Sequence, residues 1–435
     1  MGTSNNRKAA LIVNYRHWRS LELHKHHSTL GLSKAPHGNS DVAAIALQRP
    51  VQPVTLLRPH AAARAARFFT EKFPGRSLYA VKANPSADLL RVLWDAGITH
   101  YDVASIAEVR LVRATLPEAV LCFMHPVKTA KAIAEAYAVH GCRVFSLDSI
   151  EELEKIVSAT ANEDGGGAED LSLCVRLRVS SEYSELSLAS KFGVDLADAA
   201  PLLQATRQVA DSLGVCFHVG SQSMSPHAYV QALERVRAAI VKASVLVDIV
   251  DVGGGFPSVY PGMEPPPLED YFGVIDRTYE SLPISYSAEL WCEPGRALCA
   301  EYNSLIVQVE RRRGSELFIN DGAYGALFDA AHVGWRFPVK LLREDADSAD
   351  EAFSFYGPTC DDLDHMEGPF DLPGDIHAGD YIEIGMLGAY GAAMKTAFNG
   401  FGETEVHEVA DEPMASQYLG NRRDPRVSDN VVSLR

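Results

Sequence analysis

Residues 119–158 read AVLCFMHPVKTAKAIAEAYAVHGCRVFSLDSIEELEKIVS, and this stretch contains the pattern that decides the fold. A β-prone apolar run at residues 119–123 is followed by a helical pattern at 128–140. A second apolar run at 142–146 is followed by a second helical pattern at 150–158. Strands that alternate with helices are typical of βα units around a parallel sheet. The stretch therefore predicts two such units in succession.

The same alternation extends in both directions along the chain. Upstream, a strand is expected at 77–83 and a helix at 87–96. Downstream, strands are expected at 171–179, 216–219 and 247–252, with helices at 202–213 and 227–243. About eight such units over about 240 residues predict a (β/α)8 barrel, an α/β fold that resembles a TIM barrel.

Beyond residue 300 the helical pattern fades. Short strand candidates with Gly and Pro between them predict a separate β domain, and they lie at 304–311, 317–320, 352–356 and 381–384. The expected division is an N-terminal extension over 1–50 (either separate or part of the β domain), a barrel over 51–297, a β domain over 298–410 and a tail over 411–435.

Composition excludes several classes of protein. With 47% hydrophobic residues among 435, the chain is neither disordered nor collagen-like. Its formal net charge of -17 argues against a nucleic-acid partner, because a phosphate backbone is bound by clustered Lys and Arg. No apolar run is long enough to span a membrane, and no secretory signal is expected.

Cysteine and histidine usage adds two expectations. The seven cysteines form an odd set without a CxxC pair, which favours a reduced, cytoplasmic protein. The patch His24-Lys25-His26-His27 lacks an accompanying carboxylate or cysteine at ligand spacing, so no metal site is expected there.

Lys82 is the first candidate functional residue, in the stretch Tyr79-Ala80-Val81-Lys82-Ala83-Asn84-Pro85. The lysine is expected within an apolar strand that Asn84-Pro85 ends, because Pro lacks a ladder donor and disfavours helix before it. One interpretation is an edge-strand lysine whose amine reaches water. The other is a desolvated amine with a lowered pKa, ready to form a Schiff base.

Further candidates follow other strands. Gly253-Gly254-Gly255 is either a turn or a backbone cradle for phosphate. In Glu293-Pro294-Gly295-Arg296, Arg296 can bind phosphate and Glu293 can pair with a ring nitrogen, unless the stretch is a plain surface loop. His218 is either a core residue or a ring that stacks on a planar cofactor. A strand lysine, a phosphate cradle, an Arg and a Glu together are the groups that pyridoxal 5'-phosphate requires.

In combination these motifs resemble the fold type III pyridoxal-phosphate decarboxylases, the ornithine/lysine/diaminopimelate decarboxylase family, over about residues 55–405. The resemblance implies an alanine-racemase-like barrel followed by a β-sandwich or Greek-key β-barrel. It also implies a homodimer with shared active sites.

The resemblance assigns roles to residues of this chain. Lys82 would form the Schiff base, His218 would stack on the cofactor ring, and Glu293 would pair with the pyridinium nitrogen. Ser221, Gly254, Gly255, Arg296 and Tyr390 would hold the phosphate. The whole set expected to contact the cofactor is Lys82, Asp102, Arg176, His218, Ser221, Gly253, Gly254, Gly255, Glu293, Arg296 and Tyr390, with Glu108 as a further acid nearby.

The loop Gly357-Pro358-Thr359-Cys360-Asp361-Asp362-Leu363-Asp364 decides the reaction. Taken alone, it is either an acidic surface loop or a turn that presents a thiol among carboxylates. The resemblance implies that it enters the partner's site, where Cys360 would return a proton after carbon dioxide departs and Asp361 would bind a distal ammonium. Diaminopimelate decarboxylases carry Glu after this Cys, so Asp361 favours a substrate with a terminal amine.

Two further segments resemble parts of the family. The segment 320–329 is shorter than its ornithine decarboxylase counterpart, and its Tyr324 and Asp329 are expected to bind substrate, although the shortening leaves the choice between ornithine and lysine open. Lys191-Phe192-Gly193 matches a mobile loop that would act as a lid.

The expected activity is decarboxylation of L-ornithine, L-lysine or both to putrescine or cadaverine, in polyamine biosynthesis. One alternative is a related substrate: meso-diaminopimelate, arginine or a carboxylated polyamine. Another is a non-catalytic decarboxylase-like regulator, against which the presence of both Lys82 and Cys360 argues.

Overall fold

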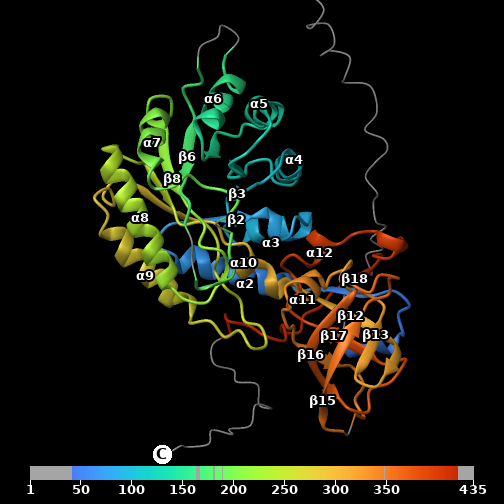
Figure 1. The fold of residues 1–435 in the computed structure, drawn as a ribbon. Coiled ribbons are helices and arrows are strands. Elements are labelled where there is room, and N and C mark those ends of the chain that lie inside the picture. The colour runs from blue at the N-terminus through green and yellow to red at the C-terminus, as the bar shows by residue number, and fades with distance from the viewer. Residues whose placement is uncertain (1–41, 163–166, 180–181, 189, 347, 420–435) are drawn as a thin grey trace, which may run out of the picture.

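The computed structural model describes residues 42–162, 167–179, 182–188, 190–346 and 348–419. The first body is a closed barrel of eight parallel strands, in the spatial order β10-β11-β2-β3-β4-β5-β6-β8 (Figure 1). Its strands are β2 (Arg76–Ala80), β3 (His100–Asp102), β4 (Val120–Phe123), β5 (Val144–Leu147), β6 (Ser172–Arg176), β8 (Ser212–Cys216), β10 (Ile249–Asp251) and β11 (Glu289–Cys292). The predicted (β/α)8 barrel is confirmed.

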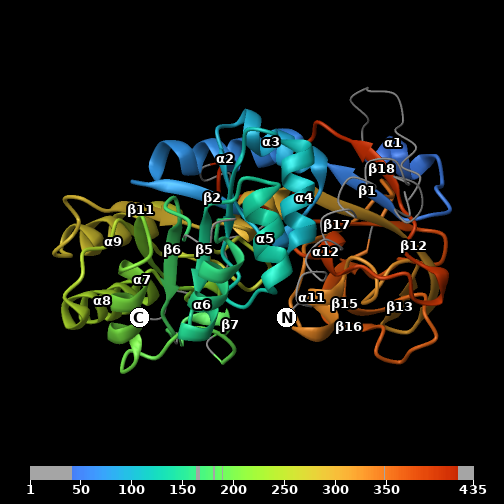
Figure 2. The same ribbon diagram turned by 90° about the horizontal axis from the view of Figure 1, so that it is seen from above.

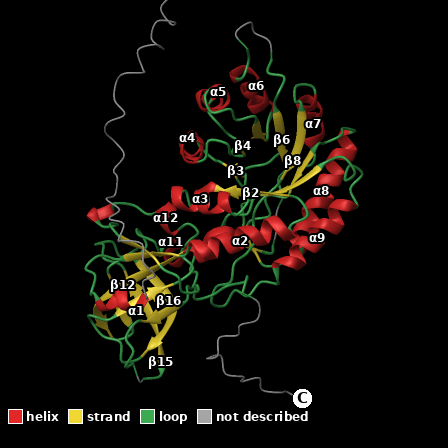
Figure 3. Ribbon diagram, turned by 180° about the vertical axis from the view of Figure 1, so that it is seen from behind, coloured by secondary structure: helices red, strands yellow, loops and turns green. Residues whose placement is uncertain are grey.

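Helices cover the outside of this barrel, as Figure 3 shows. They are α2 (Pro59–Lys72), α3 (Ala87–Asp95), α4 (Ile106–Thr115), α5 (Ala130–Ala138), α6 (Ile150–Ala159), α7 (Ala199–Arg207), α8 (His227–Ala243) and α9 (Leu268–Glu280). Four of them begin at a hydroxyl residue whose side chain accepts a backbone N–H three residues on: Ser86, Ser105, Thr129 and Ser149. These caps explain why the βα units of residues 80–160 can be recognised from sequence.

Two local expectations were wrong. The predicted helix 202–213 ends at Arg207, and the strand expected at 216–219 is β8, over 212–216. The guanidinium of Arg207 binds the carbonyls of Ala210 and Asp211 and so holds the turn between helix and strand. Ala210 and Leu213 continue the apolar spacing of the helix, so periodicity alone did not reveal this turn.

The second body is an eight-stranded sheet (Figure 2). Its long strand β12 (Asn303–Arg313) pairs with β1 (Val54–Leu57) and β17 (Tyr381–Ile384) along one half, and with β13 (Glu316–Ile319) along the other. A bulge at Val309/Arg311 separates the halves. The remaining strands are β14 (Val339–Leu341), β15 (Asp350–Tyr356), β16 (His365–Pro373) and β18 (Glu405–Glu408). The two halves enclose a core in which the rings of Phe355 and Phe370 stack at 4.0 Å.

Short elements complete the chain. A separate two-stranded antiparallel sheet is formed by β7 (Ser184–Leu186) and β9 (Ser221–Ser223). The short helices are α1 (Val42–Leu47), α10 (Arg296–Cys299), α11 (Phe328–His332) and α12 (Gly391–Met394), and 3-10 turns lie at Val81–Ala83, Ala300–Tyr302 and Phe398–Gly400. None of the helices in the described ranges is both long and apolar enough to cross a membrane.

The start of the chain crosses between the two bodies. β1 lies inside the range expected for the barrel, yet it pairs with β12 and β18 of the second sheet, and the buried face of α1 packs there too. The chain therefore enters the barrel at α2, not at residue 51. Residues 1–41, including the His24–His27 patch, lie outside the described residues.

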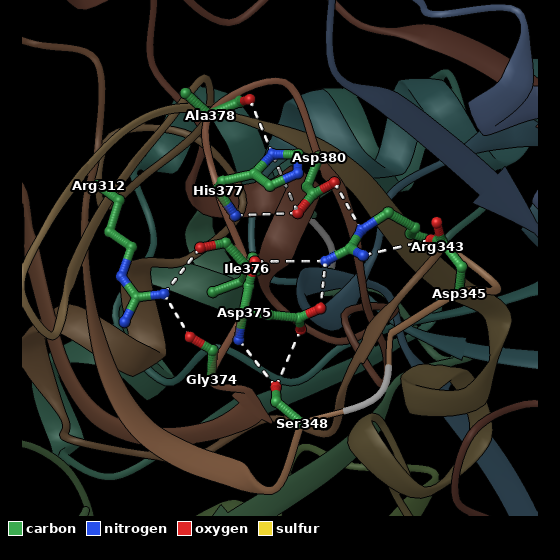
Figure 4. Close-up of polar contacts among 10 residues, drawn as sticks. All are labelled: Arg312, Arg343, Asp345, Ser348, Gly374, Asp375, Ile376, His377, Ala378 and Asp380. Atoms are coloured by element: carbon green, nitrogen blue, oxygen red, sulfur yellow. Dashed lines mark hydrogen bonds and ion pairs between the residues drawn. The ribbon is translucent and has the colours of Figure 1, made fainter.

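A polar cluster fixes the far end of the β domain (Figure 4). Arg343 forms ion pairs with Asp345, Asp375 and Asp380, while Ser348 exchanges hydrogen bonds with Asp375. These contacts tie the loop after β14 to the turn before β17.

Arg58 links the two bodies. Its guanidinium is 1% exposed and binds Ser304 at 2.6 Å, Glu383 at 2.8 Å and Asp411 at 2.8 Å. The Glu383 carboxylate is 4% exposed, so it depends on this cation for charge compensation.

Replacing Arg58 with Ala should lower the free energy of unfolding by about 3–5 kcal/mol, because it leaves the buried Glu383 carboxylate uncompensated. Urea unfolding of both proteins measures the difference. Arg110→Ala is the matched control, since it breaks the Arg110–Glu135 pair, whose arginine is 56% exposed, and should cost under about 1 kcal/mol. Equal losses in the two variants would contradict this account of Arg58.

Candidate active site

The carboxyl ends of the barrel strands surround a cavity of about 310 Å³. Its lining comes from loops after β2, β3, β4, β6, β8 and β11. The lining residues are Lys82, Asp102, Ala104, Met124, His125, Arg176, Ser187, Leu188, Ser190, Lys191, Phe192, His218 and Glu293. Barrel active sites lie at this rim. Five predicted site residues therefore meet in one place: Lys82, Asp102, Arg176, His218 and Glu293.

Lys82 lies in the 3-10 turn Val81–Ala83 that directly follows β2, not within the strand as expected. Its Nζ is 2.9 Å from Oδ2 of Asp102, and its side chain is 41% exposed to the cavity. Burial lowers the pKa of Lys82, but the nearby Asp102, Glu293 and Tyr390 outweigh it and hold the pKa above its ordinary value. The expectation of a lowered pKa was wrong, because it did not include these acids.

His218 follows β8 and lies beside the glycine run. The backbone N–H of Gly220 donates to its Nδ1 at 3.0 Å, so Nδ1 is unprotonated. Burial and the charges of Arg176 and Lys82 lower its pKa well below the ordinary value. The ring is therefore neutral and presents a flat face that suits a planar cofactor.

The three glycines bring the backbone close to other groups. A Cβ on Gly254 would lie 2.8 Å from the Glu293 carbonyl oxygen and 3.0 Å from Nε2 of His218. Gly253 and Gly255 have φ values of 66° and 102°, which L side chains rarely adopt. Only glycine therefore fits beside His218 and Glu293.

Arg296 begins helix α10, just after Glu293. Its Nη1 donates to Tyr260 at 3.0 Å and its Nη2 to Asp329 at 3.3 Å, while its buried Nε has no hydrogen-bond partner among the described residues. The guanidinium carbon lies 4.2 Å from the centroid of the Trp335 ring and 4.9 Å from that of Tyr390.

Tyr390 brings the β domain to this rim. Its backbone N–H donates to the Ala83 carbonyl at 2.7 Å, next to Lys82. Asn84 reinforces the junction with a 2.8 Å hydrogen bond to the Gly388 carbonyl. Ser221 begins β9, two residues beyond Val219, but lies outside the lining of the cavity.

The predicted residues fit pyridoxal 5'-phosphate on structural grounds. The unpaired, buried Nε of Arg296 is a free donor of the kind that a phosphate oxygen accepts. Glycine backbone without side chains lies beside the flat ring of His218, and a lysine amine faces the cavity. When bound, the cofactor supplies an electron sink for charge at the substrate's Cα.

Glu108 has a structural role that explains its position. Its Oε2 accepts the N–H of Ala104 at 2.7 Å, while the Ser105 hydroxyl caps the backbone of Glu108. The contacts resemble a capping box at the start of α4, with the carboxylate reaching one residue beyond the N-cap Ser105. The box orients the loop after Asp102.

The residues predicted to act on substrate lie elsewhere in the chain. Cys360, Asp361 and Tyr324 belong to the β domain and do not line the Lys82 cavity. Asp361 accepts a hydrogen bond from the Tyr324 hydroxyl, which together with the Leu363 N–H lowers its pKa. Buried Asp364 fixes the loop by accepting from Thr359 and Ala323.

Asp329 is placed unexpectedly. It forms an ion pair with Arg296, so a residue predicted to bind substrate meets one predicted to bind phosphate. The carboxylate is buried at the contact of barrel and β domain, and burial raises its pKa while Arg296 lowers it.

Sequence reasoning missed several residues of the site. Tyr260 and Trp335 enclose Arg296, and His125 packs edge-on against Phe192 at 4.9 Å in the cavity wall. Asp251, at the end of β10, carries a signal that was present in the sequence: an acid within an apolar strand, directly before the glycine run. In the described ranges, no group of three or more His, Cys, Asp or Glu side chains could hold a metal ion.

A rim lysine with a neutral histidine, a glycine cradle and a buried Glu on an eight-stranded parallel barrel defines a pyridoxal-phosphate enzyme of the alanine-racemase-like class. The pyridoxal-binding domain of the pyridoxal-dependent decarboxylases matches residues 60–300. The chain belongs to this decarboxylase family, and its activity is of the carboxy-lyase type.

Individual relatives agree with this assignment. A lysine/ornithine decarboxylase of Selenomonas ruminantium is 29% identical over 77% of this chain and 84% of its own length. An ornithine decarboxylase of Panagrellus redivivus is 33% identical over 77% of this chain and 80% of its own. The arginine decarboxylase of Paramecium bursaria Chlorella virus, solved with agmatine, superposes with a TM-score of 0.74 at 27% identity over 84% of this chain and 98% of its own.

Replacing Gly254 with Ala should weaken cofactor binding about tenfold or more, because the new Cβ would collide with the Glu293 carbonyl and the His218 ring. Titration of apoprotein with pyridoxal phosphate, followed by absorbance, gives the dissociation constant. Gly167→Ala is the control, since its Cβ would meet nothing within 4 Å. An unchanged dissociation constant in Gly254→Ala would contradict the cradle.

Proposed function

We propose that the protein decarboxylates L-ornithine, L-lysine or both, giving putrescine or cadaverine and carbon dioxide for polyamine biosynthesis. The observation that carries the proposal is the accessible Cys360-Asp361 pair, whose carboxylate is kept charged by Tyr324. This pair suits a substrate with a terminal ammonium, because the carboxylate can bind the ammonium while the neighbouring thiol faces the reacting carbon.

The rim residues support the first half of this chemistry. Lys82 would hold the cofactor through its amine, with Asp102 2.9 Å from its Nζ to accept or return protons. Neutral His218 would pack against the ring, and Glu293 would pair with the ring nitrogen. Arg296, the glycine run, Ser221 and Tyr390 would hold the phosphate.

The second half requires another subunit. Because Cys360 and Asp361 lie outside the cavity of their own chain, we propose a homodimer in which this loop completes the partner's site. Exposed apolar groups next to the loop support a docking surface for a second copy: Leu363 is 66% exposed, Phe398 41% and Phe401 44%. In such a site Cys360 protonates Cα and Asp361 binds the distal ammonium.

Several solved relatives carry the proposed products. A lysine/ornithine decarboxylase of Vibrio vulnificus was solved with putrescine and with cadaverine, with TM-scores of 0.71 and 0.72 and 26% identity over 84% of this chain. In this chain Asp329 is held by Arg296, which leaves the half-buried Asp361 as the carboxylate for the substrate's amine.

Arginine is the second candidate substrate, because the viral arginine decarboxylase superposes as well as the lysine/ornithine enzymes. The non-catalytic alternative has a relative too, an antizyme inhibitor of Xenopus laevis, 30% identical over 76% of this chain. The Lys82–Asp102 pair and Cys360 favour an active enzyme here.

We also propose that the chain divides into a barrel to residue 297 and a β domain over 298–410, with β1 added to the latter. A second proposal is a cytoplasmic location. Six of the seven cysteines are buried free thiols, which suits a reducing compartment. The Lys191–Gly193 lid stays a prediction, because residues 180, 181 and 189 lie outside the described ranges.

Substrate choice is tested by comparing carbon dioxide release from ornithine, lysine, arginine and meso-diaminopimelate. Ornithine or lysine should give the highest kcat/KM, and Asp361→Asn should lower it for these by about a hundredfold, since a charged contact of about 2–3 kcal/mol is lost. Asp362→Asn, one residue along the same loop, is the control. Preference for arginine or meso-diaminopimelate would contradict the proposal.

The shared site is tested by mixing Lys82→Ala with Cys360→Ala subunits. Half of the randomly formed dimers are mixed, and each mixed dimer has one intact site of two, so about a quarter of the wild-type activity should return. Each variant alone should be nearly inactive. No recovery after mixing, with exchange of subunits verified by mass spectrometry, would refute shared sites.

A further inference from the structure

Asp251 is a completely buried carboxylate that the activity described above does not use. It is the last residue of β10, and its side chain is 0% exposed. Oδ1 accepts the N–H of Gly253 at 2.8 Å, but Oδ2 has no hydrogen-bond partner within the described part of the chain. A buried polar atom without a partner is costly, so its surroundings need an explanation.

The neighbouring group is the carboxyl of Glu293. Asp251 lies opposite Trp291 in the β10–β11 pairing, and the Glu293 N–H donates to the Gly253 carbonyl at 2.8 Å. Gly253 thus contacts both residues through its backbone and places the two buried carboxyls next to each other, where a hydrogen bond between them would give Oδ2 of Asp251 a partner. Two ionised carboxylates cannot make that bond, whereas a pair that holds one proton can.

The charges around the pair come from the ends of three other strands, β2, β3 and β6. Asp102 adds negative charge, while Lys82 and Arg176 add positive charge. Four buried thiols also lie near the pair and stay protonated, because burial raises their pKa values: Cys122, Cys174, Cys216 and Cys292. Three acids thus face two cations, and one retained proton balances the group.

Burial raises the pKa of Asp251 to about 6, with the Gly253 N–H and Glu293 acting against it and Asp102 adding to it. Burial, then Asp251 and Asp102, raise the pKa of Glu293 well above its ordinary value. The pair therefore retains a proton at neutral pH.

We propose that Asp251 is a positioning residue that shares one proton with Glu293 and, through Glu293, delivers it to the ring nitrogen of the pyridoxal cofactor. The O–H bond of Glu293 breaks and an N–H bond forms, so the ring nitrogen gains a positive charge while both carboxylates become negative. The transfer needs no other reactant. It rests on a pyridoxal cofactor at this site, and not on which amino acid is decarboxylated.

Asp251 then serves as a second negative charge behind Glu293. It stabilises the protonated ring nitrogen and keeps that proton bound to higher pH. Without Asp251, Glu293 would still contact the ring nitrogen, but the nitrogen would lose its proton at a lower pH.

The direct test loads Asp251→Asn and wild type with ¹⁵N-labelled pyridoxal phosphate and follows the ring nitrogen signal with pH. The amide keeps the shape and the acceptor for Gly253 but removes the charge. In the variant, the ring nitrogen should lose its proton at a pH at least about one unit lower than in the wild type. Its kcat should fall about tenfold, with KM nearly unchanged. An identical nitrogen titration in both proteins would overturn the proposal.

A second test uses the cofactor-free protein. A carboxyl whose pKa is raised by folding stabilises the native state below its unfolded pKa of about 4, and that stability is lost as pH rises through the folded pKa. Wild-type apoprotein should therefore lose stability to urea between about pH 4 and its folded pKa of about 6, and Asp251→Asn should lose less. An equal loss in both proteins would overturn the shared proton.

Glu301→Gln is the matched control. Glu301 is buried, accepts from Ser416 and Gln417 outside the cavity, and burial raises its pKa to about 7. This variant should change the stability profile with pH but leave the ring nitrogen signal unchanged. A shift of that signal in Glu301→Gln would show a general charge effect and overturn the specific role of Asp251.

If Asp251→Asn does not fold, infrared spectroscopy of the wild-type protein tests the proposal instead. Loading the apoprotein at pH 7 should remove one protonated-carboxyl band, and its persistence would overturn the proposal. These measurements use no substrate. A negative result would therefore not affect the substrate assignment, and a wrong substrate assignment would not affect the proposal of a proton-sharing pair.

Discussion

The ion pair between Lys82 and Asp102 is the interaction on which the rest of the site depends. It fixes a lysine amine at the rim of the barrel, 2.9 Å from a carboxylate that is itself 2% exposed. Burial lowers the pKa of this amine, and the surrounding acids more than offset that effect. Lys82, Arg176 and one retained proton offset the repulsion between those acids. The protonation of each group at the rim therefore depends on the others.

This rim is assembled by two bodies rather than one. β2 brings Lys82 to the rim, and the β domain then holds the residues beside it, through Tyr390 on Ala83 and Gly388 on Asn84. Arg296 is enclosed by Tyr260, Trp335 and Tyr390, from the barrel and the β domain alike. The Arg58 network joins the same two bodies through a separate set of contacts.

Sequence reasoning worked where local patterns coincide with the geometry of a parallel barrel. Lys82, His218, the glycine run and Glu293 each follow a strand, and a barrel brings all such ends to one rim. It failed where residues far apart in the sequence, or the surrounding charges, determine the structure or the pKa. Nothing near Val54–Leu57 indicates a partner strand some 250 residues later, and the turn after Arg207 is hidden by continuing apolar spacing. The raised pKa of Lys82, the Asp329–Arg296 pair and the unpaired oxygen of Asp251 depend on residues far apart in sequence.

The central claim is that Lys82 carries the cofactor. Borohydride reduction of the loaded protein, followed by digestion and mass spectrometry, fixes the cofactor to whichever lysine holds it. The account predicts the label on the peptide that contains Lys82. A label on another lysine such as Lys191, which also lines the cavity, or no label at all, would contradict it.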